Sequence, residues 1–385
     1  NGIGAEDFTR ALRADPKRKG LLYAGTERGM YISFDDGSNW NKFQLNLPIV
    51  PITDLAIKND NLIAATQGRS FWMIDDLTPM HQLTTSLVQE DVILFKPQDS
   101  YRMGGGNGRT SKTEGTNHPG GVAINYFIKE KDAKEPVSLQ IYDSNDALIK
   151  TFSTNPNKEK KEAKLTLENG NNIFYWDMMY PGAEKVKGMI LWWASLNGPM
   201  ALPGNYKVTL TMGETSKSQN FTILKNPISE TTLADATAQF DFINDINTKV
   251  TEIHKALKNV KKVRAQVTAL QTSIKNKEKH SELLDYAASL LKEMTIIEET
   301  LYQTKSKSGQ DPLNFPIRLN NKLAHLNSLT RIGSYAPTQQ AIDFKNEINK
   351  EIDKELSKLY DLFNNKVTVL NKKVKDSQID LIQLD

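Results

Sequence analysis

The sequence contains no cysteine among its 385 residues. This absence excludes disulfide bonds, thiolate chemistry and cysteine-bound zinc or iron–sulfur centres. Long apolar runs are missing as well, and none approaches the roughly 18 residues expected of a membrane-spanning helix. The formal net charge is only +3. That value argues against a dedicated nucleic-acid binder, because such a protein carries a basic patch or stripe.

Motifs for metals, phosphates and export are also absent. The histidines are scattered, and no His-Glu-x-x-His motif occurs. The glycine-rich GGGNGRTSK lacks the residue order of a phosphate-binding loop. The opening NGIGAEDFTRALRADP is not a signal peptide, since no apolar core follows a basic start. We therefore predict no catalytic, cofactor-binding or metal-binding residues in this chain.

What is present falls into three regions, and the first, residues 1–88, predicts short repeated strands. YAGTERGMYISFDD and AATQGRSFWMIDD each place a glycine turn between a small-residue strand and an aromatic strand, and each ends in two aspartates. A repeat of about forty residues with four strands is typical of β-propeller blades. Two blades cannot close a ring, because their edge strands would lie exposed. We therefore expect a C-terminal part of a longer protein, with the remaining blades in a missing N-terminal part or a separate chain.

The second region, residues 89–228, begins with the linker MGGGNGRTSKTEGTNHPGG and continues with strands. VAINYFI, VSLQIYD, AKLTLEN, NIFYWDM and NYKVTLTM alternate apolar and polar residues and are separated by turn residues. This spacing predicts an immunoglobulin-like (Ig-like) antiparallel β-sandwich.

The third region, residues 229–385, is helical by its apolar periodicity. Apolar residues recur at steps of three and four from Phe240 to Ile274, and Thr232 with Asp235 forms a capping pair. A helix over about 231–274 would be roughly 65 Å long and needs partners along its length. Three further helices follow, the last with Pro337 in its first turn. An elongated antiparallel helical bundle is expected.

The whole chain resembles the end of a bacterial sortilin-like propeller protein with Asp-box (BNR) repeats. SFDDGSNW is an Asp-box, and NIFYWDMMYPG with GPMALPGNYKVTLT is similar to the Ig-like domain of flagellar hook-capping proteins. TTLADATAQFDFINDINTKV resembles the helical tail of the same family, whose members are commonly labelled exported glycosyl hydrolases. LIAATQGRSFWMIDDL resembles the closing blade of these propellers. The resemblance implies a closing-blade motif made of Gly68, Arg69, Phe71, Trp72, Asp75 and Asp76.

The Asp-box residues are predicted to build a turn. Asp35 and Gly37 suit a tight corner, Ser33 adds a hydroxyl hydrogen bond, and Trp40 packs between strands. A glycosidase with two catalytic carboxylates is the alternative interpretation. Adjacent aspartates on a strand point to opposite faces, so only Asp35 with Asp75, one from each blade, would meet across a substrate.

Two neighbouring tryptophans, Trp192 and Trp193, form the candidate binding surface. Aromatic rings of this kind stack against carbohydrate or pack on a neighbouring domain. The competing interpretation is that Trp176 fills the sandwich core while one of Trp192 and Trp193 faces outward.

These observations lead to one expected function and two alternatives. We expect an exported bacterial binding or scaffold protein, located in the periplasm, on the outer-membrane surface or outside the cell. It would recognise protein, peptide or glycan ligands through the completed propeller and associate with other envelope proteins. The alternatives are a glycoside hydrolase with catalytic residues in the missing blades and a sortilin-like peptide receptor.

Overall fold

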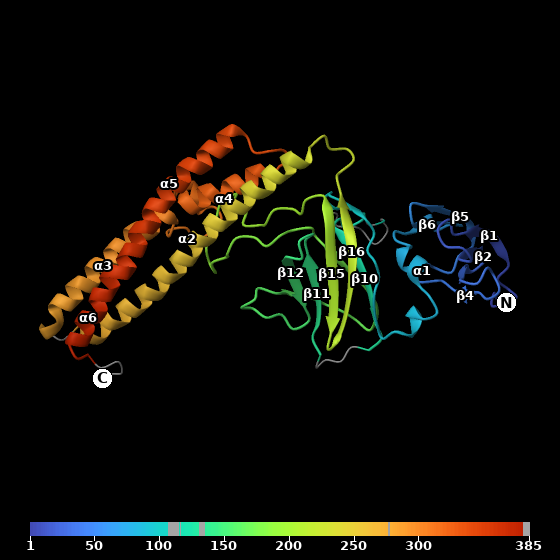
Figure 1. Cartoon of the computed structure of the whole chain (residues 1–385), viewed down its shortest axis with the longest axis horizontal. Helices are drawn as coiled ribbons and strands as arrows, with labels where there is room; N and C mark the ends of the chain where they lie inside the picture. Colours follow the sequence, from blue (N-terminus) through green and yellow to red (C-terminus); the bar gives the residue numbers. More distant parts are fainter. Residues whose placement is uncertain (107–114, 116, 131–134, 276–277, 380–385) are drawn as a thin grey trace. The chain divides into compact units, whose positions relative to one another are not determined.

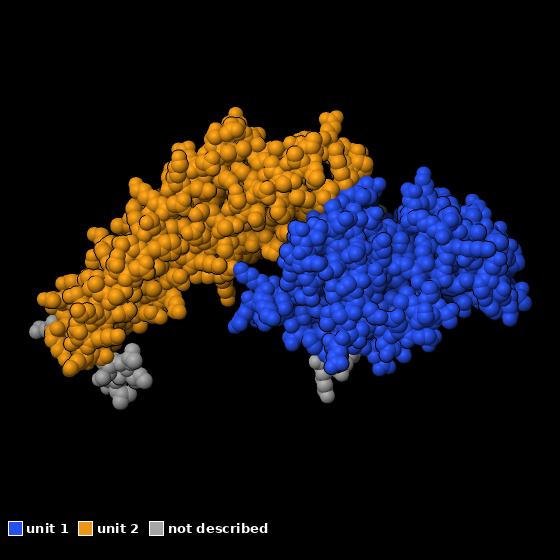
Figure 2. All heavy atoms as spheres, in the orientation of Figure 1, with its two compact units in different colours: residues 1–177, 204–224 blue, residues 178–203, 225–385 orange. Residues whose placement is uncertain are grey.

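The computed structural model describes residues 1–106, 115, 117–130, 135–275 and 278–379. Contacts divide the chain into two compact units, coloured separately in Figure 2. No helix in the described ranges is long and apolar enough to cross a membrane. The chain is multidomain, with several antiparallel sheets in the first unit and most helices in the second (Figure 1). The first unit is Asn1–Asp177 with Gly204–Leu224, and the second is Met178–Pro203 with Lys225–Asp385.

Two small antiparallel sheets begin the first unit, in the strand orders β1-β2-β3-β4 and β5-β6-β7. They share one core that includes Tyr23 and Ile52. Gly25 explains why a small-residue strand is needed, since a Cβ there would lie 2.6 Å from Ile52 Cγ2. A short helix, α1 (Thr78–Gln82), and a 3-10 turn at Leu87–Gln89 follow. The strands are β1 (Thr9–Ala14), β2 (Leu22–Thr26), β3 (Gly29–Ser33), β4 (Asn41–Lys42), β5 (Ile52–Lys58), β6 (Asn61–Thr66) and β7 (Phe71–Ile74).

Two further sheets complete the first unit and pack their apolar faces together. Trp176 of β14 is fully buried, and its ring lies 5.7 Å from Tyr206 of β15 and 6.1 Å from Phe221 of β16. The three-stranded sheet has the order β14-β10-β8 and the six-stranded sheet β13-β12-β11-β15-β16-β9. The strands are β8 (Val92–Leu94), β9 (Ser100–Tyr101), β10 (Val122–Ile128), β11 (Val137–Tyr142), β12 (Leu148–Ser153), β13 (Ala163–Lys164), β14 (Gly170–Trp176), β15 (Gly204–Met212) and β16 (Thr215–Leu224).

The expected strands of this region mostly form. β11 buries every second side chain, as the alternation in VSLQIYD predicts. AKLTLEN is the exception, because only Ala163–Lys164 pairs, in parallel, with β12. Leu165 and Leu167 stay buried although the chain has left the ladder. Residues 107–114 and 116 of the expected glycine-rich linker lie outside the described residues.

In the residues described, the second unit contains the five α-helices α2 to α6, which share one apolar core. The longest, α2, begins at a capping box in which Thr232 and Asp235 exchange side-chain and backbone hydrogen bonds, as predicted. Its buried side chains include Val250, Ile253 and Leu257, in the predicted steps of three and four. The helices are α2 (Leu233–Ile274), α3 (Ser281–Leu301), α4 (Leu319–Thr330), α5 (Gln339–Asp361) and α6 (Thr368–Asp376).

The last helical stretch differs from its prediction at two points. Pro337 lies outside the first turn of α5, because Thr338 is the N-cap and its side chain accepts a hydrogen bond from the Ala341 amide. A π-helical turn at Leu362–Val367 separates α5 from α6. This turn shifts the helical register, so that Leu362 and Leu370 both reach the core.

An irregular segment, Met178–Pro203, joins the helices rather than the strands that flank it in sequence. Its two ends meet at an antiparallel bridge between Met179 and Met200. The Tyr180 ring meets the Phe240 ring of α2 edge-on, at a centroid distance of 4.8 Å. The division therefore differs from the expected boundaries of 89–228 and 229–385, and it places Trp192 and Trp193 in the helical unit.

Candidate functional site

Trp193, in the irregular segment Met178–Pro203, is largely exposed, with 74% of its surface accessible. Its backbone φ is +51°, in the left-handed region that non-glycine residues rarely adopt. Such a conformation costs on the order of 1–3 kcal/mol and persists only where the surroundings enforce it. Trp192 is partly buried, and its ring lies 5.8 Å from that of Trp193 at an interplanar angle of 44°. The two indoles therefore form one aromatic surface whose outer part faces solvent.

The side chain of Asn321 on α4 bonds both the backbone amide and the backbone carbonyl of Trp192. The Trp192 amide donates to Asn321 Oδ1 at 2.7 Å, and Asn321 Nδ2 donates to the Trp192 carbonyl at 2.9 Å. Only 4% of Asn321 is exposed. The buried side-chain amide thus supplies the two hydrogen bonds that a neighbouring strand would supply in a sheet. It fixes the residue immediately before Trp193.

A second amide pair holds the segment farther along. Asn247 of α2 and Asn327 of α4 both donate to the Asn197 carbonyl, at 2.8 and 3.1 Å. Asn327 also donates to Asn247 Oδ1 at 2.9 Å, which couples the two helices. The Ser195 amide donates to the backbone carbonyl of Ala324 at 3.0 Å. The segment is therefore fixed to α2 and α4 by polar groups as well as by apolar packing.

His254 of α2 anchors the first half of the segment and is fully buried. Its Nδ1 lies 2.6 Å from the Glu184 carbonyl, which only accepts, so Nδ1 carries the proton. Its Nε2 then accepts from Asn320 Nδ2 at 3.3 Å. Burial lowers the pKa of His254, because the charged imidazolium would be poorly solvated, and Lys258 nearby adds to that effect. His254 is thus held neutral as a structural anchor.

The residues predicted to form an Asp-box satisfy one another's hydrogen bonds. Ser33 Oγ donates to Asp35 Oδ1 at 2.8 Å and accepts from the Gly37 amide at 3.0 Å. Asp35 also accepts from the amide and side chain of Asn39, and these bonds lower its pKa. Gly37 has φ +87°, and a Cβ there would lie 3.6 Å from the Trp40 ring. All four predicted Asp-box residues therefore meet in one turn between β3 and β4.

The residues of the closing-blade motif separate into an exposed and an anchored set. Phe71 is 75% exposed on β7, and Asp75 is exposed as well. Trp72 is partly buried, and its Nε1 donates to the Arg69 carbonyl at 3.0 Å. Gly68 has φ +82°, which the turn before β7 requires.

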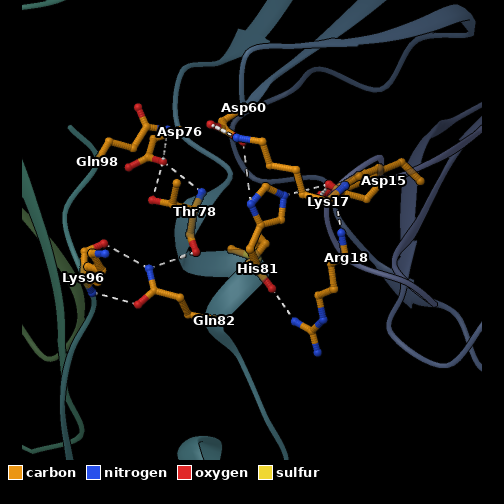
Figure 3. Close-up of polar contacts among 12 residues, drawn as sticks. Asp15, Lys17, Arg18, Asp60, Asp76, Thr78, His81, Gln82, Lys96 and Gln98 are labelled. Atoms are coloured by element: carbon orange, nitrogen blue, oxygen red, sulfur yellow. Dashed lines mark hydrogen bonds and ion pairs between the residues drawn. The ribbon is translucent and has the colours of Figure 1, made fainter. Parts of the chain in front are cut away.

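Asp76, the last residue of that motif, joins three parts of the first unit. Its Oδ1 accepts from the amide and hydroxyl of Thr78 and from Gln98 Nε2, at 2.6 to 2.8 Å (Figure 3). Its Oδ2 accepts from Asn125 Nδ2 of β10 at 3.0 Å. Both carboxylate oxygens are therefore engaged in connecting α1 with the following sheet.

A carboxylate–histidine cluster, Asp15, His81 and Asp60, lies on the other side of α1 (Figure 3). His81 Nε2 is 2.8 Å from Asp15 Oδ2, and Nδ1 is 3.8 Å from Asp60 Oδ1. Burial alone would raise the pKa of Asp15. Hydrogen bonds from the Lys17 and Arg18 amides and from His81 lower it below 3.8.

The sequence did not predict this cluster, because His81 is one of several scattered histidines with no motif around it. The sequence does contain a local pattern for Asp15, in Asp15-Pro16-Lys17-Arg18. An aspartate whose side chain accepts from the amides two and three residues later forms an Asx turn, and Asp15 accepts from the Lys17 and Arg18 amides. In the part of the chain that the structure describes, no serine or threonine hydroxyl bonds to His81. The cluster therefore links the β1–β2 loop, the β5–β6 turn and α1, and it presents no nucleophile.

Neither Asp35 nor Asp76 has a free carboxylate poised for acid–base chemistry, and no ion pair or hydrogen bond among the described residues joins Asp35 to Asp75. The described residues also contain no group of three or more His, Asp or Glu side chains that could hold a metal ion. The features that stand out are therefore a clamped, exposed aromatic surface in the second unit and two polar junctions in the first.

Comparison with known proteins identifies no family for this chain. No family model matches the chain, and no curated protein does. The solved structures that match include the extracellular domains of two sensor proteins of B. thetaiotaomicron. The hybrid two-component system BT3049 shares 9% identity at a TM-score of 0.16, over 57% of this chain and 26% of that one. The one-component system BT4673 shares 10% identity at a TM-score of 0.17, over 58% of this chain and 26% of that one.

The chain thus spans about a quarter of the length of these structures. A TM-score this low does not indicate a common fold, so these similarities assign neither a fold nor a function to the chain.

Proposed function

We propose that this chain is a binding or scaffold component, exported to a bacterial envelope or cell surface, that contacts its ligand through Trp193. The observation that carries the proposal is the presentation of that indole. It is 74% exposed at φ +51°, and the preceding residue is clamped by two hydrogen bonds to buried Asn321. An exposed ring held in a costly backbone conformation is typical of a functional position. Its flat apolar face suits a sugar ring or an apolar side chain of a protein ligand.

The architecture proposed around this surface supports such a role. The sheets β1–β4 and β5–β7 are taken as propeller blades, to be completed by the remainder of the propeller. The sheets that bury Trp176 are taken as an Ig-like sandwich, and α2–α6 as an elongated helical spacer. Other envelope proteins are the expected partners. The occupied carboxylates of Asp35 and Asp76 favour this role over glycoside hydrolysis by this chain.

The test compares Trp193→Ala with a matched control, Phe71→Ala. Phe71 is 75% exposed, so both changes remove an exposed aromatic ring, but in different units. Each variant and the parent chain are titrated with a panel of bacterial surface glycans and envelope protein extracts by surface plasmon resonance. We expect Trp193→Ala to weaken binding at least about tenfold, as removal of an aromatic hot spot does. Phe71→Ala should bind like the parent.

Two results would contradict the proposal. One is equal binding by the parent and Trp193→Ala. The other is glycan turnover by the parent chain, because hydrolysis by this chain would favour the enzyme alternative.

A further inference from the structure

The helical unit contains a second surface, separate from Trp193, between α4 and the start of α5. A groove with a volume of about 730 Å³ runs along α4 and the connection to α5. Four large apolar side chains in its wall remain accessible: Leu329 is 52% exposed, Ile332 74%, Tyr335 69% and Phe344 41%. Apolar side chains gathered in one hollow, rather than scattered singly, are typical of an interaction site.

The charge around the groove has one sign. None of the residues that line it is acidic, and Lys322 and His325 lie in the lining one helical turn apart on α4. Arg318, the N-cap of α4, precedes Lys322 by a further turn. Within the part of the chain that the structure describes, none of these three side chains forms an ion pair or a side-chain hydrogen bond. The groove is therefore apolar along its floor and basic along one edge.

The length of the groove distinguishes between occupants. The lining on α4 runs from Lys322 to Thr330, about 12 Å at 1.5 Å per residue, and Ile317 before the helix and Ile332 after it extend the groove at both ends. An amphiphile with a single carboxylate would meet one of the cations and fill part of that length. An amphipathic helix of about three to four turns would span it, place apolar side chains at steps of three and four against the floor, and pair acidic residues with the edge. Two helices forming the walls also match this mode of recognition.

We propose that this groove docks an amphipathic helix of a partner protein that carries acidic residues along one edge. Leu329, Ile332 and Phe344 receive its apolar face. Lys322, with Arg318 beside it, pairs with its acidic edge. The site is independent of Trp193, so the two can be tested separately.

The experiment uses the full chain and a pair of labelled peptides of about 18 residues. Both carry leucine at helical steps of three and four. One has glutamate at the remaining positions and the other has lysine. Fluorescence anisotropy measures binding, and chemical-shift changes at the Leu329 and Ile332 methyl groups locate it. We expect the glutamate peptide to bind with a Kd below about 100 µM and more weakly as salt rises.

Variants then assign the contacts. Leu329→Asp should weaken the glutamate peptide at least about tenfold, because it buries a charge against an apolar face. Lys322→Glu should weaken the glutamate peptide and strengthen the lysine peptide, since it reverses the sign of the edge. Lys261→Glu, an exposed change on α2, is the matched control and should alter neither. Circular dichroism confirms that each variant keeps its helix content.

Three outcomes would overturn the proposal. The first is that neither peptide binds at about 1 mM. The second is equal binding of both peptides, or binding that Leu329→Asp leaves unchanged. The third is that dodecanoate perturbs the groove methyl groups while the glutamate peptide does not, which would identify a site for a small anionic amphiphile.

Discussion

The two units use different groups for their distant hydrogen bonds. In the first unit, aspartates combine local bonds, as Asp35 accepts from Asn39, with distant ones, as Asp76 accepts from Asn125. In the second unit, buried amides on helices reach a segment distant in sequence, as Asn321 does with Trp192. Local bonds form with their own turn. Long-range bonds form only when the tertiary structure does, so their loss should affect the segment that presents Trp193.

The largest effect is expected in the apolar core of the first unit. Trp176→Ala should lower the free energy of unfolding by about 3–5 kcal/mol, because Trp176 is fully buried against Tyr206 and Phe221. Urea unfolding followed by circular dichroism measures it. Trp193→Ala removes the same ring from an exposed position and should change stability by less than about 0.5 kcal/mol. Equal losses in the two variants would mean that the Trp193 side chain is buried and does not face solvent.

The next effect separates the long-range bonds from the core. Asn321→Ala should cost about 1–3 kcal/mol, since it leaves the partly buried amide and carbonyl of Trp192 without these partners. It should also increase hydrogen exchange in Met178–Pro203 and weaken binding through Trp193. Asn346→Ala, at an exposed position of α5, is the control and should leave both unchanged. Exchange in this segment that matches the parent would show that apolar packing alone holds it.

The same contrast explains what the sequence could predict. The SFDDGSNW turn, the Thr232 capping box and the apolar stripe of α2 are local patterns, because each depends on residues a few positions apart that bond or pack within their own element. The assignment of Met178–Pro203 to the helices was not predictable, because it depends on single amides such as Asn321 and Asn327 that do not disturb a helical period. His81 is similar, since its partner Asp15 lies in the β1–β2 loop, far from α1 in the sequence.

The candidate site was predicted in part for the same reason. Adjacent tryptophans in Trp192–Trp193 are conspicuous in a sequence with few of them. Their burial is decided by the φ of Trp193 and by the Asn321 clamp, neither of which leaves a periodic pattern. The groove beside α4 could not be predicted either, because the apolar residues of α4 that line it fit the stripe expected of an ordinary core helix.

A smaller effect is expected from a local bond of the first unit. Ser33→Ala should cost about 1 kcal/mol, because the buried hydroxyl bonds both the Gly37 amide and Asp35. The loss should stay in the turn between β3 and β4 and leave exchange in Met178–Pro203 unchanged. Ser38→Ala removes an exposed hydroxyl from the same turn and should have no measurable effect. If Ser33→Ala loosened the second unit, the distinction between local and long-range bonds would fail.

The smallest effect is a difference in pH dependence between the units. Burial lowers the pKa of His254 below 6.5, so the unfolded chain takes up its proton at a higher pH than the folded chain does. The stabilisation from neutral His254 is therefore complete above about pH 6.5 and declines as pH falls toward the folded pKa. The pKa of Asp15 is lowered from 3.8, so its contribution is lost only at more acidic pH.

Urea titrations followed by the amide NMR signals of each unit, at about pH 7.5 and about pH 5.5, measure this difference. We expect the second unit to lose stability between these values and the first to lose less. His254→Asn keeps a donor for the Glu184 carbonyl but has no group that titrates, so it should remove the pH dependence of the second unit. A pH dependence that persists in His254→Asn would assign it to other groups, and the contrast between the units would then have to rest on the amide clamps alone.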